Sequence, residues 1–157
     1  MKIFCNGDMV DQSSFDQLFE PGFLFGWGAF ETIRVYNGSI AFLELHIDRL
    51  QASLEKIGID RTSLDWRMTI GDLLESNSLD DAYVRITAYK KRKGTGIVVH
   101  AAPFGYYKPQ TYEKGFTAVV FPHTIDTLSD TWTIKSLSYL EKRKAWFFAQ
   151  KEKKDEA

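Results

Sequence analysis

The sequence contains a single cysteine, Cys5, and so has no second thiol for an internal disulfide. This excludes a secreted scaffold held together by disulfides, and a reducing cytoplasm is the expected location. A surplus of charge is also missing, because 20 Lys and Arg residues face 21 Asp and Glu residues and leave a net charge of −1. A general nucleic-acid binder normally carries a basic surplus, so nucleic acid is not an expected partner.

Long apolar runs and metal-ligand motifs are absent as well. No hydrophobic stretch approaches the roughly 20 residues that span a bilayer. The first seven residues, MKIFCNG, turn polar too early for a signal peptide. The histidines His46, His100 and His123 lie far apart, and none stands in a spaced motif with cysteine or carboxylate. We therefore expect neither a membrane partner nor a metal site.

Apolar and aromatic side chains are plentiful instead. Hydrophobic residues make up 44% of the chain and aromatic residues 15%, with 12 Phe, 7 Tyr and 4 Trp. This composition excludes a disordered or low-complexity chain. A length of 157 residues fits one domain of ordinary size, and the material for a packed core is present.

Strand and helix patterns alternate along the chain, which predicts an α/β (α+β) fold. Two Asn-Gly pairs, at 6–7 and 37–38, indicate tight hairpin turns because both residue types tolerate positive φ. The predicted strands are 3–5, 30–36, 39–43, 83–89, 97–102 and 116–121, the last nearly all apolar and expected to be buried on both faces. The predicted helices are 44–57, 63–75 and one that begins after Lys135, with Ser136 or Ser138 near its N-cap. The predicted loops are 11–28, 103–114 and 122–131.

Apolar residues at helical spacing predict which helix faces are buried. In the first helix the expected core face consists of Leu43, Ile47, Leu50, Leu54 and Ile57. In the second helix Leu64, Met68 and the pair Leu73 and Leu74 are expected to point inward. In the third helix the expected stripe consists of Leu137, Leu140, Phe147 and Phe148.

Glycine pairs and a basic run have simple structural interpretations. The pairs Gly26-x-Gly28 and Gly94-x-Gly96 do not complete G-x-G-x-x-G between a strand and a helix, so turn geometry is their expected role. The run of basic residues 90–93 is expected to be a solvated hairpin tip.

Four basic residues have both a structural and a functional interpretation. Arg49 lies on the polar side of a helix, where a surface Arg paired with a neighbouring Asp48 or Glu44 is the common case. Arg34 and Arg85 stand inside strands, where an Arg usually faces solvent, yet either one would clamp a carboxylate if a second domain buried it. Lysines placed like Lys135, just before a helix, are mostly exposed, whereas a desolvated lysine near a cation can act as an amine nucleophile.

Four blocks of the sequence resemble the class IV (fold type IV) pyridoxal-phosphate enzymes. They are GFLFGWGAFETIRVYNG at 22–38, LHIDRL at 45–50, YVR at 83–85 and IKSLSYL at 134–140. The family includes branched-chain and D-amino-acid aminotransferases and 4-amino-4-deoxychorismate lyases. Any one block alone is a weak signal, but all four in order over the whole chain form a specific one.

The resemblance implies a role for each of five residues. Lys135 is implied as the catalytic residue, which forms the Schiff base with pyridoxal 5′-phosphate and moves the substrate proton. Arg49 is implied to bind the cofactor phosphate, and Phe30, Arg34 and Arg85 to lie near the substrate pocket. The implied reaction transfers an amino group between an amino acid and a 2-oxo acid, in a homodimer that serves amino-acid metabolism. An aminodeoxychorismate lyase and a non-catalytic remnant stay open as alternatives.

The chain departs from the family pattern in two places near the site and at its end. Trp27 and Ser138 stand where the family usually has Asp and Asn. After Lys135 the sequence has 22 further residues, 157 − 135, and the family's second half contains the Glu that pairs with the pyridine nitrogen. We therefore interpret 1–115 as an N-terminal α/β domain and 116–157 as the truncated start of a C-terminal cofactor domain. The chain is then a fragment of a longer protein or a truncated reading frame.

Overall fold

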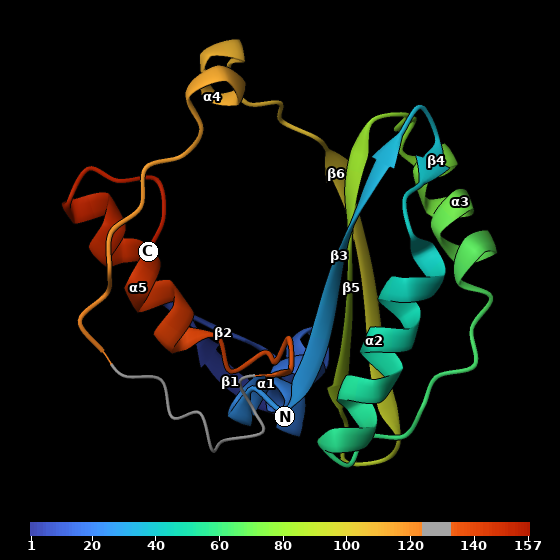
Figure 1. The fold of residues 1–157 in the computed structure, drawn as a ribbon. Helices are drawn as coiled ribbons and strands as arrows, with labels where there is room; N and C mark the ends of the chain where they lie inside the picture. Colours follow the sequence, from blue (N-terminus) through green and yellow to red (C-terminus); the bar gives the residue numbers. More distant parts are fainter. Residues whose placement is uncertain (124–132) are drawn as a thin grey trace.

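A four-stranded antiparallel sheet organises the first two thirds of the chain. The computed structural model describes residues 1–123 and 133–157, so most of the predicted loop 122–131 lies outside the described residues. The strands are β3 (Gly28–Tyr36), β4 (Ser39–Ile40), β5 (Ala82–Lys90) and β6 (Thr95–Pro103), in the order β4-β3-β5-β6 (Figure 1). The hairpin around Asn37-Gly38 is confirmed by the register Val35↔Ile40 and Tyr36↔Ser39, but its predicted second strand 39–43 is too long, because β4 ends at Ile40 and α2 begins at Leu43. The predicted mixed helix-and-sheet class is confirmed.

Two helices cover one face of this sheet and close the core. They are α2 (Leu43–Lys56) and α3 (Trp66–Ser76), and they pack on the same side (Figure 1). The predicted face of α2 is confirmed, because Leu43, Leu50 and Leu54 are buried while Ile47 and Ile57 pack partly buried against the core. Buried residues of β3 and β5, such as Ile33 and Ile86, meet this face.

The inward face predicted for α3 is partly wrong. Leu64 and Met68 are exposed, whereas Trp66, Ile70 and Leu74 are buried one helical turn apart. The cause is the start of the helix, since the Asp65 side chain accepts a hydrogen bond from the Met68 amide at 2.9 Å. This cap begins the helix three residues later than the prediction, and Met68 lies outside the face formed by Trp66, Ile70 and Leu74.

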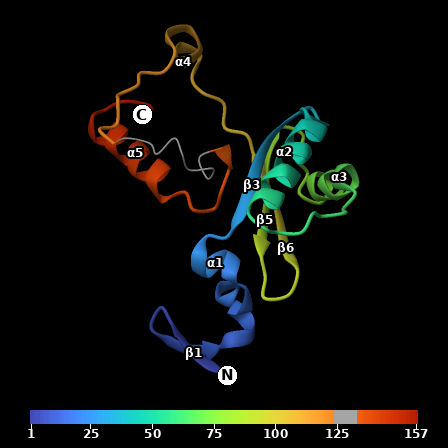
Figure 2. The ribbon, with the colours of Figure 1, turned by 60° about the horizontal axis from the view of Figure 1, so that its bottom comes forward.

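The N-terminal segment is more regular than predicted. Strands β1 (Lys2–Cys5) and β2 (Asp8–Asp11) form the hairpin expected from Asn6-Gly7, and both turn residues have positive φ. The predicted loop 11–28 is wrong, because it contains the 3-10 helix η1 (Gln12–Phe19) and the helix α1 (Pro21–Phe25). Pro21 suits the first position of α1, and Gly26 ends it with a left-handed φ of 62°. Figure 2 shows the hairpin extending away from the sheet beyond α1.

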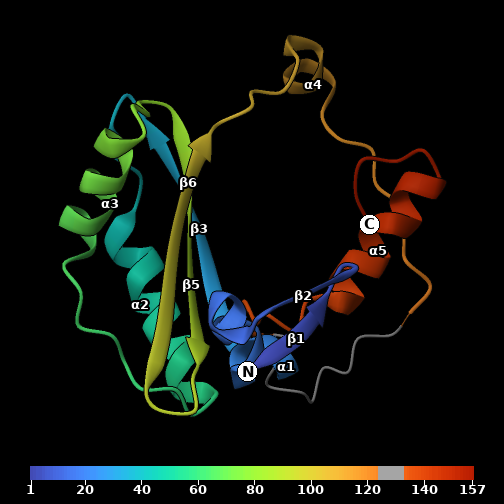
Figure 3. The same ribbon diagram turned by 180° about the vertical axis from the view of Figure 1, so that it is seen from behind.

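After β6 the chain leaves the sheet and returns on its other side. The predicted loop 103–114 is partly wrong, because its second half forms the helix α4 (Pro109–Lys114). The last helix is α5 (Leu140–Lys151), which lies opposite α2 and α3 (Figure 3). The predicted buried strand 116–121 is wrong. In the described part of the chain its strand-like pairing is a single bridge between Ala118 and Glu156, and Val120 is 88% exposed. An apolar run makes a strand only where a neighbouring strand offers its backbone.

The start of α5 also differs from the prediction. The helix begins at Leu140 with Tyr139 as N-cap and no side-chain cap, and the Ser138 amide donates to Ser136 Oγ at 3.0 Å instead. Of the predicted apolar stripe, Leu140 and Phe147 are exposed. Among the helices of the described ranges, none combines the length and the apolar character needed to cross a membrane.

Candidate active site

Lys135 lies on a short segment that extends the sheet at the edge of β3. The Phe30 amide donates to the Lys135 carbonyl at 2.9 Å, and the Leu137 amide donates to the Gly28 carbonyl at 2.9 Å. Between them Ser136 forms an antiparallel bridge with Ala29. The preceding residue, Ile134, is buried at 3% exposure. The backbone of Lys135 is thus fixed to a rigid strand although it stands outside a regular element.

Two glycines permit this docking. A Cβ on Gly28 would stand 2.5 Å from the Ala88 carbonyl oxygen and 2.6 Å from Leu137 Cδ1. A Cβ on Gly26 would stand 2.8 Å from Ser138 Oγ. The turn role expected for Gly26 fits its positive φ, but Gly28 has a different role, which is the close approach of the Lys135 segment to the sheet.

Phe30 is the centre of a cluster on the sheet face opposite α2. The Lys135 Nζ atom lies 5.2 Å from the centre of its ring, and the Arg85 Cζ atom lies 3.6 Å above it. The Tyr139 ring meets Phe30 edge-on at 5.4 Å. The structure therefore brings together Lys135, Phe30 and Arg85, three of the residues that the sequence singled out. Tyr139 was missed, although it stands four residues after Lys135 in the same sequence block.

Arg85 is half-buried and has an unsatisfied charge. Its neighbour across the sheet is Thr32 in β3, and its guanidinium lies against the Phe30 ring. Within residues 1–123 and 133–157, no hydrogen bond or ion pair engages this guanidinium. Desolvation lowers the pKa of Arg85, and the neighbouring Tyr139 and Tyr83 partly offset that effect. A partly desolvated guanidinium without an anion favours the binding of one, such as a carboxylate.

Arg49 pairs with Glu31 rather than with Asp48 or Glu44. Arg49 Nε and Nη2 donate to the two Glu31 carboxylate oxygens at 2.6 Å each. His46 Nδ1 lies 2.8 Å from Glu31 Oε2, and Nδ1 must be the protonated nitrogen because a carboxylate only accepts. The Glu31 side chain is 1% exposed, whereas that of Arg49 is 53% exposed. The guanidinium is held from inside the protein and is open to solvent on its other side.

The charge of Glu31 is stabilised by these neighbours. Burial alone raises the pKa of Glu31, but the hydrogen bonds from Arg49 and His46 outweigh it, with the charges of Arg49 and Lys135 acting in the same direction. The net pKa lies below its ordinary value of 4.5, so Glu31 is an anion at neutral pH. In return, the Glu31 carboxylate raises the pKa of Arg49.

Arg34 lies on the same sheet face as Phe30, four residues along β3, and its two terminal nitrogens, Nη1 and Nη2, are engaged while Nε has no hydrogen-bond partner among the described residues. Its guanidinium donates to Asp81 Oδ1 at 3.0 Å, to the Ala82 carbonyl at 2.9 Å and to the Tyr106 hydroxyl at 2.9 Å. It also stacks on the Phe104 ring at 3.8 Å. These contacts tie β3 to the start of β5 and to the segment that leaves β6. No contact joins Arg34 to the Phe30 cluster among the described residues.

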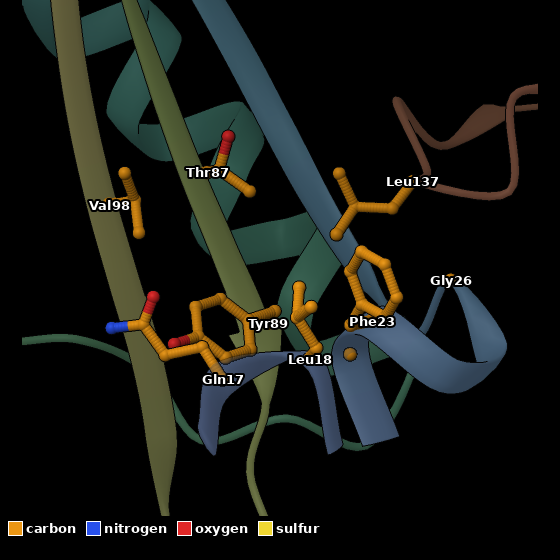
Figure 4. Close-up of a pocket in the computed structure, with 9 residues that line it drawn as sticks. Gln17, Leu18, Phe23, Gly26, Thr87, Tyr89, Val98 and Leu137 are labelled. Carbon is orange, nitrogen blue, oxygen red and sulfur yellow. The ribbon is translucent and has the colours of Figure 1, made fainter. Parts of the chain in front are cut away.

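A mainly apolar pocket adjoins the cluster on the open sheet face (Figure 4). Thr87 in this pocket stands opposite Phe30 in the strand register, and Leu137 follows Lys135 by two residues. Figure 4 shows Leu137 and Phe23 on one side of the pocket, with Thr87 and Val98 on the β5 and β6 side. The lining residues are Gln17, Leu18, Gly22, Phe23, Gly26, Thr87, Tyr89, Val98 and Leu137.

The groups present suit pyridoxal 5′-phosphate, the cofactor that the sequence resemblance implies. Its aldehyde needs a primary amine on a fixed element, which Lys135 provides. Its phosphate needs a forked donor of permanent charge, and the exposed edge of Arg49 is of this kind. Trp27, which replaces the family's usual Asp, donates from Nε1 to the Ile57 carbonyl at 2.8 Å and so joins the start of β3 to the end of α2.

Comparisons with known proteins agree with this chemistry. The profile of the family Amino-transferase class IV matches residues 28–157. The D-alanine aminotransferase of Bacillus licheniformis is 29% identical over 131 residues, which cover 76% of this chain and 46% of that protein. The aminodeoxychorismate lyase of Bacillus subtilis is 33% identical over 87 residues, which cover 54% of this chain and 30% of that protein.

The solved structures include a close match in fold. The branched-chain aminotransferase of the archaeon Thermoproteus uzoniensis superposes with a TM-score of 0.75 at 26% identity, covering 99% of this chain and 58% of that one. The matched region thus spans only about half, or less, of these relatives.

Proposed function

Because the chain belongs to the class IV aminotransferase family, we propose that it forms part of the active site of a pyridoxal-phosphate enzyme. The proposed reaction transfers an amino group between an amino acid and a 2-oxo acid. The observation that supports it best is that an amine and an unpaired guanidinium both lie next to one aromatic ring. Lys135 Nζ is 5.2 Å and Arg85 Cζ is 3.6 Å from the centre of the Phe30 ring.

Each residue has a part in this proposal. When bound, pyridoxal phosphate withdraws electrons from the substrate carbon that loses its proton. Lys135 holds the cofactor and then accepts and returns that proton, as general base and acid in turn. Arg49 binds the phosphate, and Arg85 holds the substrate carboxylate through its free donors. Phe30 forms a wall of the substrate site, and Arg34 is fixed at its border by Asp81.

The domain division and the assembly belong to the same proposal. We place the N-terminal domain at 1–115 and the start of the cofactor domain at 116–157, since the chain leaves the sheet after β6. A cytoplasmic homodimer is the proposed assembly. Its support is the exposed apolar surface of α1, where Phe23, Leu24 and Phe25 are 64%, 52% and 70% exposed.

A lyase that releases pyruvate from aminodeoxychorismate is the second candidate. The observation that favours it is the 33% identity to the Bacillus subtilis lyase over 87 residues. Both reactions use the same lysine and cofactor. They differ in whether a 2-oxo acid must be supplied to take up the amino group.

The test supplies the complete gene product with pyridoxal phosphate and a panel of L- and D-amino acids, with and without an added 2-oxo acid. We expect a new 2-oxo acid to form only when the acceptor is present, and Lys135→Ala to abolish it. Lys144→Ala, which removes an exposed lysine paired with Glu141, should leave the rate unchanged. Pyruvate release from aminodeoxychorismate without an acceptor would instead establish the lyase, and the absence of both reactions would contradict an enzymatic role.

A further inference from the structure

We propose that Glu31 is the positioning residue of the phosphate site: it occupies one edge of the Arg49 guanidinium and thereby presents the other edge to the cofactor phosphate. This inference rests on the proposed function, because it gives Arg49 its phosphate. Glu31 belongs to the sequence block 22–38, but the family resemblance gave it no role.

The geometry of the pair determines which donors stay available. Glu31 takes the Nε hydrogen and one Nη2 hydrogen of Arg49, at 2.6 Å each. An arginine has five N–H donors in a planar fork, so both Nη1 hydrogens and the second Nη2 hydrogen remain. One Nη1 hydrogen and the second Nη2 hydrogen lie along the outer edge of the plane and match two oxygens of a phosphate.

The buried position of Glu31 fixes its carboxylate, and with it the contact to Arg49. Glu31 lies on the core face of β3, with Ala29 and Ile33 as its buried neighbours on that face. Its Oε2 atom also contacts His46 Nδ1 at 2.8 Å. A carboxylate fixed in this way removes rotamer freedom from Arg49 before any ligand binds, so binding no longer carries that entropy cost.

A surface pair of the same shape provides the contrast. Arg61 Nε and Nη2 donate to the two Glu55 oxygens at 3.2 Å and 3.0 Å, which is the same forked arrangement. The Arg61 and Glu55 side chains are 64% and 58% exposed. A pair in which both members are mobile and solvated holds neither partner in place. Burial of the carboxylate is therefore the feature that separates the Glu31 pair from this one.

Glu31 has two opposing effects on phosphate binding: its negative charge weakens binding, whereas its contact with Arg49 orients the guanidinium and strengthens binding. We expect the orienting effect to be the larger. The Glu31 carboxylate repels a phosphate dianion, so removing its charge would by itself tighten phosphate binding. The guanidinium is half in solvent, however, where water and salt weaken that repulsion. Loss of the fork lets the long Arg49 side chain sample other rotamers, and that loss is the larger effect.

The experiment compares pyridoxal phosphate with pyridoxal, which lacks the phosphate, as ligands of the purified protein. In Glu31→Gln, we expect the affinity for pyridoxal phosphate to fall about tenfold, the scale of the rotamer freedom of one Arg side chain, while pyridoxal binding changes less than about twofold. A merely structural role would weaken both ligands together. Glu55→Gln makes the same chemical change in the surface pair and should alter neither affinity.

A double substitution shows whether Glu31 acts through Arg49. Arg49→Lys should itself reduce the preference for the phosphate compound, and adding Glu31→Gln to it should cause no further reduction. If Glu31→Gln does not fold, Glu31→Asp replaces it, since Asp keeps the buried charge but is one methylene too short to reach both nitrogens.

Equal or tighter binding of pyridoxal phosphate by the folded Glu31 variant would overturn the inference. A wild-type protein that binds pyridoxal phosphate no better than pyridoxal, or whose binding is untouched by Lys135→Ala, would overturn the proposed function instead.

Discussion

Glu31 carries a negative charge inside the core, and the fold tolerates it only because of its partners. An ionised carboxylate that loses its partner in such a place costs about 3–5 kcal/mol. The Arg49 fork and the His46 hydrogen bond remove that cost. The same contact therefore has two consequences at the residue scale, since it stabilises the fold and it fixes the group proposed to bind phosphate.

The lowered pKa of Glu31 predicts a dependence of stability on pH. A carboxyl whose pKa is lower in the folded than in the unfolded chain adds stability above its ordinary value of 4.5, and that stability is lost as the pH falls through the folded value. We expect the free energy of unfolding to exceed that of Glu31→Gln at pH 7, and the difference to shrink steadily in acid below about pH 4.5. Urea unfolding followed by circular dichroism at several pH values measures it. Parallel curves for the two proteins would contradict the prediction.

At this scale the sequence was informative where a family resemblance marks a residue, because chemistry alone left the basic residues with both a structural and a functional interpretation. Lys135 and Arg85 were singled out because the four ordered blocks that contain them resemble a known family, and the structure places both beside Phe30. Glu31 was missed, although the alternation in β3 placed it on the inward face with Ala29 and Ile33. A carboxylate that points into the core requires a cationic partner, so the sequence could have predicted that Glu31 pairs with a basic residue.

At the scale of elements, the segment 134–137 depends on the edge of β3 for its position. The two backbone hydrogen bonds that form the antiparallel bridge between Ala29 and Ser136 hold it there, and Gly28 leaves the space for Leu137. The arrangement explains how Lys135 acquires a fixed backbone just outside α5. Helix and strand propensities could not predict this pairing, because its two segments, at the start of β3 and around Ser136, lie more than a hundred residues apart in the sequence.

Gly28→Ala should therefore loosen the Lys135 segment. The added Cβ would stand 2.5 Å from the Ala88 carbonyl oxygen, so backbone must move, and we expect a loss of about 1–3 kcal/mol of stability, the usual cost of overpacking. Hydrogen exchange of the Leu137 and Phe30 amides should become faster. Gly71→Ala is the control, because nothing lies within 4 Å of its added Cβ and alanine favours a helix by about 0.5–1 kcal/mol. Unchanged exchange in Gly28→Ala would show that the segment is held in another way.

Elements with strong local signals were predicted best. Helix α2 follows from the spacing of its apolar residues, and the hairpins at Asn6-Gly7 and Asn37-Gly38 follow from their turn residues. Each of these signals is contained in a short stretch of sequence. The segment 116–121 was not predictable in this way, because its state depends on whether another strand lies beside it. The face of α3 was misjudged because one cap, Asp65, sets where the helix begins.

At the scale of the whole molecule, the two faces of the sheet differ: helices cover one face and the other is open, while Arg49 lies on α2 and pairs with Glu31 of the covered face. The helices α2 and α3 cover the core face (Figure 1). Phe30 and Arg85 alternate with the core-facing residues of β3 and β5 and so lie on the opposite face, beside the pocket (Figure 4). The matched region spans 46% of the Bacillus licheniformis enzyme and 58% of the Thermoproteus uzoniensis enzyme.

The most direct measurement is the identity of the lysine that binds the cofactor. The protein is incubated with pyridoxal phosphate, reduced with borohydride and digested, and the modified peptide is located by mass spectrometry. Lys135 and Arg49 both belong to the 157-residue chain, so that chain is used, and the proposed phosphate contact with Arg49 should direct the aldehyde to Lys135. We predict one dominant pyridoxyl group on Lys135, lost in Lys135→Ala and retained in Lys144→Ala. Label on a different lysine, or label spread evenly over the exposed lysines, would contradict the account.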